Sequence, residues 1–310
     1  MKIYKDIQEF QVVNYAVVTV GTFDGLHTGH QKIIKKMTVL AKENKGETIV
    51  VTFDPHPRLV IYSNSKTLKF INIQKRKFKM LEQLGIDHLI IIPFTKEFAR
   101  TSSEDFIRKY LIEKIKTKKL IIGYDHHFGS NREGNFEKLS GLGKKYGFEI
   151  VEIPAQYIEN IPVSSTKIRN ALIEGNIRKA NAMLGYEYSI TGIVVEGNKI
   201  GRIIGFPTAN IEIADHFKLI AARGVYACKI EWRGKIYYGM GNIGIRPTIG
   251  INGLVTEVHI FDFDEDIYGE EITIYFIDRI RDERKFESLE ELKKQLIKDR
   301  ETVSELLKFT

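Results

Sequence analysis

The sequence predicts two domains of different class: an α/β domain with a doubly wound parallel sheet, then an antiparallel β-barrel or sandwich that ends in a helix. Three observations support this. The chain has 310 residues, more than most single hydrophobic cores need. Up to about Leu184, short apolar runs alternate with helical patterns; after Gly185, hydrophobicity alternates with period two between glycine turns. The predicted domains are therefore 1–184 and 185–310, with the boundary near residues 184–188.

The first half contains five apolar runs with the length of buried strands. Helical patterns lie between them, as in residues 104–116, where Phe106, Tyr110 and Leu111 recur at helical spacing. This alternation is typical of a parallel sheet, whose ligands bind beyond the carboxyl ends of the strands. The predicted strands are residues 17–20, 48–53, 89–93, 120–123 and 148–153.

The second half predicts antiparallel strands joined by tight turns. Arg233-Gly234 separates two of these strands and predicts a hairpin. A helix is expected over residues 288–307, because Ser288 and Glu291 form a capping box before a leucine stripe. The predicted strands are residues 224–232, 235–240, 255–261 and 271–276, and their pattern fits a barrel or a sandwich.

Composition narrows the function classes. No window approaches 18 uninterrupted apolar residues and the first ten residues carry charges, so we expect a cytoplasmic protein without a membrane partner. The single cysteine, Cys228, excludes an intramolecular disulfide and predicts a core residue. The net charge of +7 comes partly from clusters at 75–77, 114–119 and 144–145, which we interpret as solvated faces. They lack aromatic platforms for bases, so no nucleic-acid partner is expected.

Residues 21–30, Gly-Thr-Phe-Asp-Gly-Leu-His-Thr-Gly-His, predict a nucleotide phosphate site. They follow the first predicted strand and precede a helical pattern over residues 31–44. Glycines let the backbone approach a ligand, and the start of a helix favours an anion, which His27 and His30 would flank. The alternative is a glycine turn with two surface histidines. Residues 54–57 and 123–125 also directly follow predicted strands, so all three segments should converge on one crevice.

Residues 201–210 form a second glycine-bearing loop. Thr208 and Asn210 are two residues apart and can present oxygen ligands on one side of an extended segment, which suits magnesium carrying phosphates. The alternative is a turn with hydroxyl and amide caps.

Several motifs also carry a family resemblance. The His-x-Gly-His turn resembles the nucleotidylyltransferase superfamily, relatives of the class I aminoacyl-tRNA synthetases. Residues 205–210, Gly-Phe-Pro-Thr-Ala-Asn, resemble the riboflavin kinase signature, and residues 241–248 and 257–262 match further stretches of that family. Residues 53–57, 123–129 and 164–169 fit the FMN adenylyltransferase pattern. As a whole, the chain resembles the bacterial bifunctional riboflavin kinase/FAD synthetases, with His127 and Gly241 as small departures.

The resemblance implies two ATP-consuming reactions: riboflavin to FMN with release of ADP, and FMN to FAD with release of pyrophosphate. In the kinase reaction Glu257 is the expected base, and Thr208 and Asn210 are the expected Mg²⁺ ligands. The remaining expected ATP-binding residues of the kinase are Gly201, Arg202, Gly205 and Pro207.

In the adenylyl transfer, the phosphate of FMN is already an anionic nucleophile, so stabilising the leaving pyrophosphate is the main need. His27 and His30 are expected to donate hydrogen bonds to the triphosphate, and Arg169 to clamp it. The other expected ATP contacts are Gly21, Phe23, Gly25, Ser164, Ser165 and Thr166. The expected flavin contacts are Asp54, His56, Pro57, Asp125 and Phe128, the last by stacking.

Two other functions fit parts of the pattern. One is a basic RNA-binding module without catalysis, and the other is an enzyme that has lost one of the two activities. The two phosphate loops and Glu257 favour the bifunctional enzyme, acting as a monomer or weak homo-oligomer.

Overall fold

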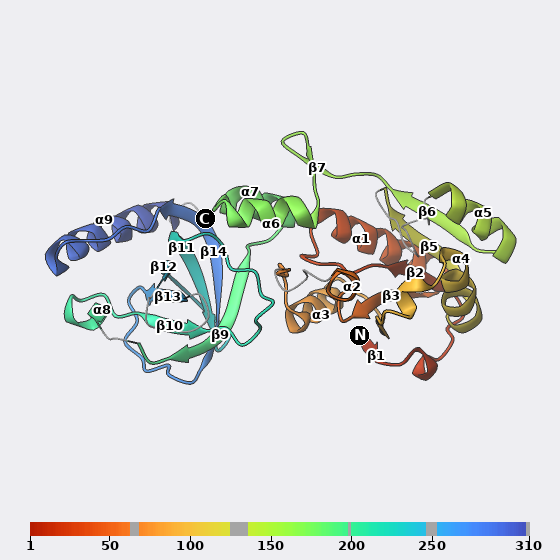
Figure 1. Ribbon diagram of the computed structural model, residues 1–310, viewed down its shortest axis with the longest axis horizontal. Helices are drawn as coiled ribbons and strands as arrows, with labels where there is room; N and C mark the ends of the chain where they lie inside the picture. Colours follow the sequence, from red (N-terminus) through yellow and green to blue (C-terminus); the bar gives the residue numbers. More distant parts are fainter. Residues whose placement is uncertain (63–67, 125–135, 198–199, 246–252, 308–310) are drawn as a thin grey trace. The chain divides into compact units, whose positions relative to one another are not determined.

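The computed structural model describes the chain except for residues 63–67, 125–135, 198–199, 246–252 and 308–310. It divides into two compact units, Met1–Ser165 and Thr166–Thr310. The first contains a parallel sheet with helices, and the second a closed antiparallel barrel followed by a helix (Figure 1). The predicted fold class is confirmed. The sequence left a barrel and a sandwich open for the second unit, and the structure is a barrel.

The sheet of the first unit has six strands in the order β1-β4-β3-β2-β5-β6, all paired in parallel. The strand order reverses between β2 and β5, and the carboxyl edge at such a reversal is where open α/β sheets bind ligands. β1 was missed because it has only three residues, two of them exposed. The strands are β1 Lys2–Tyr4, β2 Ala16–Val20, β3 Glu47–Asp54, β4 His88–Pro93, β5 Thr117–Gly123 and β6 Glu149–Ile153.

Helices cover both faces of this sheet. Helix α1, Thr28–Glu43, contacts β2, β3 and β5. A core cluster that includes Val18, Phe106 and Leu139 fills the opposite face. The helix predicted over 104–116 is an α-helical turn, α4, that continues as the π-helix η4. The other helices are η1 Ile7–Glu9, α2 Pro57–Ile61, α3 Gln74–Gln83, η3 Phe98–Arg100, α4 Ser103–Phe106, η4 Ile107–Lys114 and α5 Phe136–Tyr146.

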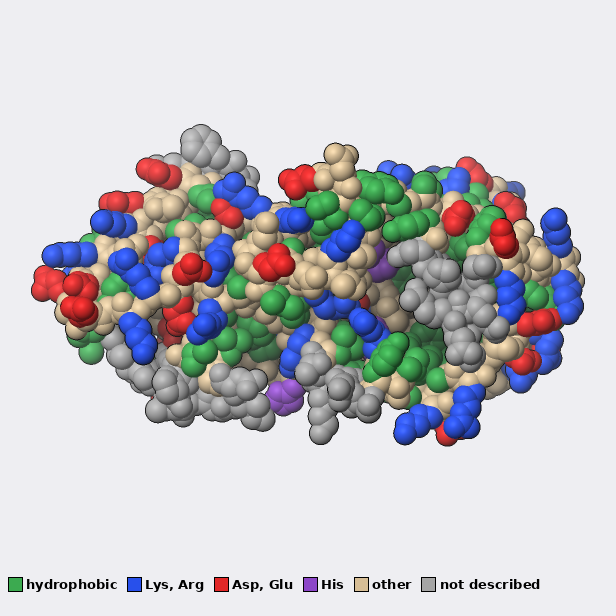
Figure 2. Space-filling model, turned by 45° about the horizontal axis from the view of Figure 1, so that its top comes forward, with side chains coloured by type: hydrophobic (Ala, Val, Ile, Leu, Met, Phe, Trp, Pro, Cys, Tyr) green, Lys and Arg blue, Asp and Glu red, His purple; other side chains and the backbone are tan. Residues whose placement is uncertain are grey.

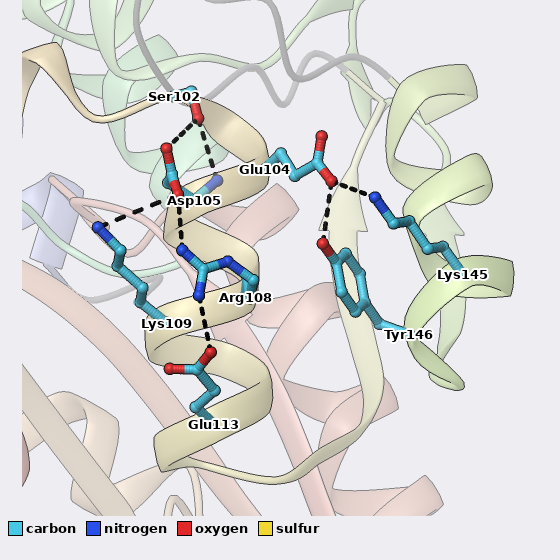
Figure 3. A network of polar contacts seen from close by, with 8 residues as sticks. All are labelled: Ser102, Glu104, Asp105, Arg108, Lys109, Glu113, Lys145 and Tyr146. Carbon is cyan, nitrogen blue, oxygen red and sulfur yellow. Dashed lines mark hydrogen bonds and ion pairs between the residues drawn. The ribbon is translucent and has the colours of Figure 1, made fainter.

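A surface network links α4 to α5 (Figure 3). Glu104 accepts hydrogen bonds from Lys145 Nζ at 2.6 Å and from the Tyr146 hydroxyl at 2.9 Å. Arg108 on η4 forms ion pairs with Asp105 of α4 and with Glu113 of η4. The Lys145 side chain is 60% exposed, as predicted for a basic cluster on a solvated face.

The barrel of the second unit closes in the order β10-β13-β12-β11-β14-β9. The predicted hairpin at Arg233-Gly234 is confirmed: φ is 49° and 75° at the two residues, as a type I′ turn requires. Cys228 lies buried on β11, where burial raises the pKa of its thiol. The strands are β9 Ser189–Val195, β10 Ala209–Glu212, β11 Gly224–Trp232, β12 Lys235–Ile245, β13 Leu254–Ile260 and β14 Glu271–Arg281.

The last helix, α9 Leu289–Leu307, packs on the outside of the barrel against β11, β12 and β14. Its Val303 is fully buried. Asp299, 2% exposed, accepts hydrogen bonds from Arg281 Nε at 3.0 Å and Nη2 at 2.7 Å. Ser288 caps the helix as predicted, its hydroxyl accepting from the Glu291 N–H at 3.2 Å. A bidentate ion pair therefore fixes α9 to the barrel.

Two helices, α6 Ser165–Ile173 and α7 Ile177–Leu184, precede the barrel. Gly175 breaks the run with φ of +79°, a conformation that helical residues do not adopt. Within the second unit α7 packs on β14, where Asn181 Nδ2 donates to the Phe276 carbonyl at 2.8 Å. Smaller elements also not predicted are β7 Tyr157–Ile158, β8 Ile161–Pro162 and α8 Ile200–Ile203.

Candidate active sites

The turn at residues 21–30 connects β2 to α1 at the carboxyl edge of the sheet. The Gly21 N–H donates to the Val51 carbonyl at 3.0 Å, which fixes the start of the turn to β3. Gly25 has φ of +80°, and a Cβ there would lie 2.9 Å from Ile71 Cδ1. The turn therefore needs a glycine for its conformation and for its close packing.

The two histidines of this turn stack on each other. Their ring centroids are 3.7 Å apart with planes inclined by 18°, and the Phe23 ring meets His30 edge-on at 5.0 Å. His27 caps α1, its Nδ1 accepting from the His30 N–H at 3.4 Å. Such a neutral imidazole carries its proton on Nε2 and can donate from there.

Burial decides the charge of His27. The residue is 7% exposed, and desolvation lowers its pKa from 6.5 to about 4. At neutral pH, His27 is therefore an uncharged hydrogen-bond donor. Its burial disfavours the alternative of two merely exposed surface histidines.

Ser165, at the start of α6, is tied to the same turn. Its hydroxyl donates to the Asp24 carbonyl at 2.9 Å, and the Asp24 carboxylate accepts from the Ile71 N–H at 3.0 Å. Ser164 is half-buried beside it. Thr166, exposed, and Arg169, half-buried, belong to the second compact unit. Within α6, Arg169 lies one turn beyond Ser165 on the same helix face.

The expected flavin-binding segment follows β3. Asp54 is the last residue of this strand and is exposed, and Pro57 begins α2. His56 caps α2, its Nδ1 accepting from the Arg58 N–H at 3.1 Å. His56 therefore has a structural role whatever else it binds. Asp125 and Phe128 lie outside the described residues.

Lys77 on α3 was missed as a site residue. Its Nζ donates to the Thr22 carbonyl at 3.1 Å, inside the phosphate turn. Burial lowers the pKa of Lys77, while the charges of Asp24 and Asp54 raise it. For Lys77 the interpretation as part of a solvated face was wrong. The signal was available, because Lys77, Met80, Leu81 and Leu84 have the spacing of one helix face.

The second site lies on the barrel, where strand register aligns three polar residues. Asn210 on β10 is directly opposite Glu257 on β13, which is directly opposite Asn242 on β12. Opposed residues of antiparallel strands project from the same face with Cβ atoms about 5 Å apart. The expected base and an expected metal ligand are therefore neighbours, and Asn242 extends the row.

Asn210 presents a buried side-chain oxygen near the start of β10. It is 6% exposed, and its Oδ1 is buried without a hydrogen-bond partner among the described residues. A Cβ at Gly197 would lie 2.1 Å from Asn210 Nδ2, so that glycine makes room for the amide. Thr208, just before β10, is exposed. A buried amide oxygen and a hydroxyl two residues before it are ligand types that fit Mg²⁺, which takes few protein oxygens and keeps water and phosphate ligands.

The loop before β10 is shaped by its glycines. The Phe206 N–H donates to the Gly201 carbonyl at 2.7 Å, and a Cβ at Gly201 would lie 2.2 Å from the Phe206 carbonyl oxygen. Gly205 has φ of +84°. Arg202 projects from α8 and is exposed.

His259 fixes this loop to β13 and was also missed. Its Nδ1 donates to the Pro207 carbonyl at 2.7 Å, and the rings of Phe206 and Phe261 lie 5.2 Å and 5.7 Å from it. Burial lowers the pKa of His259. Because it lies two residues after Glu257 on the same strand, the two side chains share a face.

Two family models match the chain. The model described as FAD synthetase matches residues 10–167, and the one described as riboflavin kinase matches residues 184–307. Proteins called bifunctional riboflavin kinase/FMN adenylyltransferase are similar over nearly their whole length. One from Buchnera aphidicola is 40% identical over 96% of each chain, and one from Escherichia coli is 34% identical over 95% of this chain and 93% of its own.

A solved structure agrees over the full length. A Streptococcus pneumoniae protein described as a macrolide-efflux protein superimposes with a TM-score of 0.89, at 31% identity and 98% coverage of both chains. Among the described residues of the present chain, no helix is long and apolar enough to cross a membrane.

Proposed function

The chain belongs to the family of bifunctional riboflavin kinase/FMN adenylyltransferases, and we propose how its residues divide the two reactions. It phosphorylates riboflavin with ATP to FMN, then transfers the adenylyl group of a second ATP to FMN, forming FAD and pyrophosphate. We assign adenylyl transfer to residues 1–184 and the kinase to residues 185–310. The separate matches to residues 10–167 and 184–307 support this division.

For the kinase, the row of Asn210 and Glu257 carries the proposal. Glu257 accepts the proton of the terminal ribityl hydroxyl as that oxygen attacks the γ-phosphorus of ATP, and ADP leaves. Asn210 and Thr208 would hold Mg²⁺, which would neutralise part of the phosphate charge. The backbone of Gly201, Gly205 and Pro207 forms the loop over the phosphates, with Arg202 adding positive charge.

For adenylyl transfer, the phosphate oxygen of FMN attacks the α-phosphorus of ATP, and the bond to the pyrophosphate oxygen breaks. His27 donates a hydrogen bond from Nε2 to the triphosphate, and His30 donates a second one. The turn that receives the triphosphate is shaped by Gly21, Phe23 and Gly25. Ser164, Ser165 and Thr166 bring the start of α6 to the phosphates, and Arg169 clamps them.

We assign flavin recognition in this reaction to Asp54, His56 and Pro57, together with Asp125 and Phe128. The position of Asp54 at the carboxyl end of β3 supports this assignment, because ligands of parallel sheets bind at that edge.

We further propose that the substrates are free small molecules, with no nucleic-acid partner and no membrane partner, and that the enzyme is a monomer or weak homo-oligomer. On the face shown in Figure 2, basic and acidic side chains are interspersed, whereas an RNA-binding surface gathers its basic residues.

One experiment tests the division of labour. Purified protein is incubated with ATP, Mg²⁺ and either riboflavin or FMN, and flavins are resolved by chromatography. Glu257→Gln should stop FMN formation but still convert supplied FMN to FAD, and His27→Ala should accumulate FMN without FAD. Equal loss of both activities in either variant, in a folded protein, would overturn the assignment.

A further inference from the structure

Lys77 contacts the phosphate turn at residues 21–30, although it belongs to none of the motifs discussed above. It projects from α3, and its Nζ donates to the Thr22 carbonyl at 3.1 Å. Thr22 is followed by Phe23, Asp24 and Gly25, whose backbone leads into the two histidines. Lys77 is therefore bonded to the backbone of the turn itself and not only to a neighbouring side chain.

The charges of two carboxylates act on the same ammonium group. Asp24 and Asp54 both stabilise the charged form of Lys77, against the opposing effect of its burial. Asp24 is already engaged, accepting from the N–H groups of Ile71 at 3.0 Å and Asn72 at 3.3 Å. Lys77 thus lies where the ends of β2 and β3 meet the segment that leads into α3.

Removing a lysine ammonium from water is unfavourable unless its charge is used. A hydrophobic residue at this position would complete the apolar face of α3 formed by Met80 and Leu81. A partly buried, charge-coupled lysine at the ligand-binding edge of a parallel sheet is more typical of a functional site than of a structural one.

We infer that Lys77 is a positioning residue for adenylyl transfer, holding the Thr22 carbonyl and adding fixed positive charge behind the turn that receives the triphosphate of ATP. This rests on the proposed function of the turn. Fixing the Thr22 peptide keeps the N–H groups around Phe23 and the cap of α1 in one arrangement before ATP arrives. The positive charge also offsets Asp24 and Asp54, which would otherwise repel a polyphosphate.

The test uses the full chain with Lys77→Met, Lys77→Arg and Lys75→Met. Lys75 is exposed on the same helix and gives the matched control. FAD formation from FMN is measured with ATP and FMN varied separately, and FMN formation from riboflavin checks the other activity of the same molecules.

For Lys77→Met we expect kcat/KM for ATP in FAD formation to fall about 10- to 100-fold, with KM for FMN changed less than about threefold. Lys77→Arg should recover part of this loss, and Lys75→Met should stay within about twofold of the unaltered chain. Riboflavin phosphorylation should be unchanged in all three variants.

Two results would overturn the inference. One is FAD formation within about twofold of normal in Lys77→Met. The other is a parallel rise of KM for both substrates, with lowered thermal stability and no recovery in Lys77→Arg, which indicates a merely structural role. His27→Ala, assayed alongside, separates the two proposals: if it retains FAD formation, the function proposed for the turn fails, and if only Lys77 proves neutral, this inference alone fails.

Discussion

Asn210 on β10 lies directly opposite Glu257 on β13, so their side chains leave the same face of the barrel as nearest cross-strand neighbours. A residue suited to hold a cation and a residue suited to accept a proton are thus aligned by hydrogen-bond register, without a loop having to bring them together. Asn242 on β12 continues the row beyond Glu257. Regular strands hold functional groups more rigidly than loops do, which favours accurate positioning of the attacking hydroxyl.

Gly197→Ala should weaken the kinase selectively. The added methyl group would meet Asn210 Nδ2 at 2.1 Å, so the amide must move away from its present position. We expect the Mg²⁺ concentration needed for half-maximal FMN formation to rise about tenfold. Titration of Mg²⁺ in the riboflavin kinase assay measures this, and Gly141→Ala on α5, where a Cβ meets nothing within 4 Å, serves as a glycine control outside the site. An unchanged Mg²⁺ dependence would contradict a metal role for Asn210.

His259→Leu and His259→Asn should separate packing from hydrogen bonding. His259 Nδ1 donates to the Pro207 carbonyl at 2.7 Å, and an asparagine amide can donate from nearly the same position. Leucine should therefore lower kcat/KM for riboflavin phosphorylation about tenfold or more, whereas asparagine should retain most of it. FAD formation from supplied FMN reports on the integrity of each preparation. Equal activity of the two variants would show that the hydrogen bond is unimportant.

Asp299→Asn should destabilise the barrel unit. Asp299 is 2% exposed and receives Arg281 at 2.7 Å and Gln295 Nε2 at 2.7 Å, so the substitution leaves a guanidinium without its counter-charge. We expect a loss of about 3 kcal/mol in unfolding free energy. Urea unfolding followed by the fluorescence of Trp232, the only tryptophan and a buried residue of β11, measures it.

The matched control is Asp262→Asn, which removes the pair with Arg300 at 2.9 Å on an 87% exposed side chain. Such surface pairs contribute little, so the urea midpoint should hardly move. Similar shifts in the two variants would show that the Arg281 pair contributes no more than a surface contact.

His27 should make the first unit less stable in mild acid. Its pKa is about 4 in the folded chain and 6.5 when unfolded, so below pH 6.5 the unfolded chain binds a proton that the folded chain does not. The free energy of unfolding therefore falls as the pH drops from 6.5 to about 4, and His27 lowers it no further below that pH. The total loss due to His27 is about 3 kcal/mol. Hydrogen exchange of the α1 amides at several pH values measures the effect. His27→Asn keeps a capping oxygen but does not titrate, and an identical pH dependence in that variant would refute the prediction.

The sequence predicted those features that depend on local periodicity. All five strands predicted in the first unit are present. All four predicted in the second unit are also present: β11 has the predicted bounds, and the other three differ from theirs by one to five residues at an end. β12 and β14 are longer than predicted because glycines and charged residues near their ends interrupt the alternation while the ladder continues. The short strands β1 and β10 have too few residues for any period to show.

What could not be predicted depends on tertiary contacts. His259 is an ordinary strand residue in the sequence, and only its partner at Pro207 shows what it holds. The opposition of Asn210 and Glu257 requires the register of β10 against β13, which no spacing along the chain reveals. Lys77 is the intermediate case. Its position on the helix indicated a buried side chain, whereas its charge suggested a side chain exposed to solvent.

The helix that follows the break at Gly175 bears on where the barrel could be separated from the rest of the chain. α7 follows this break and packs on β14 through Asn181, whose amide bonds both Phe276 and Tyr188. A protein cut at residue 185 would separate the barrel from α7, although the residues proposed for the kinase all follow that point. The part of the chain that packs as one unit with the barrel is therefore longer than the part that carries the proposed kinase residues, because it includes α7 ahead of the first barrel strand.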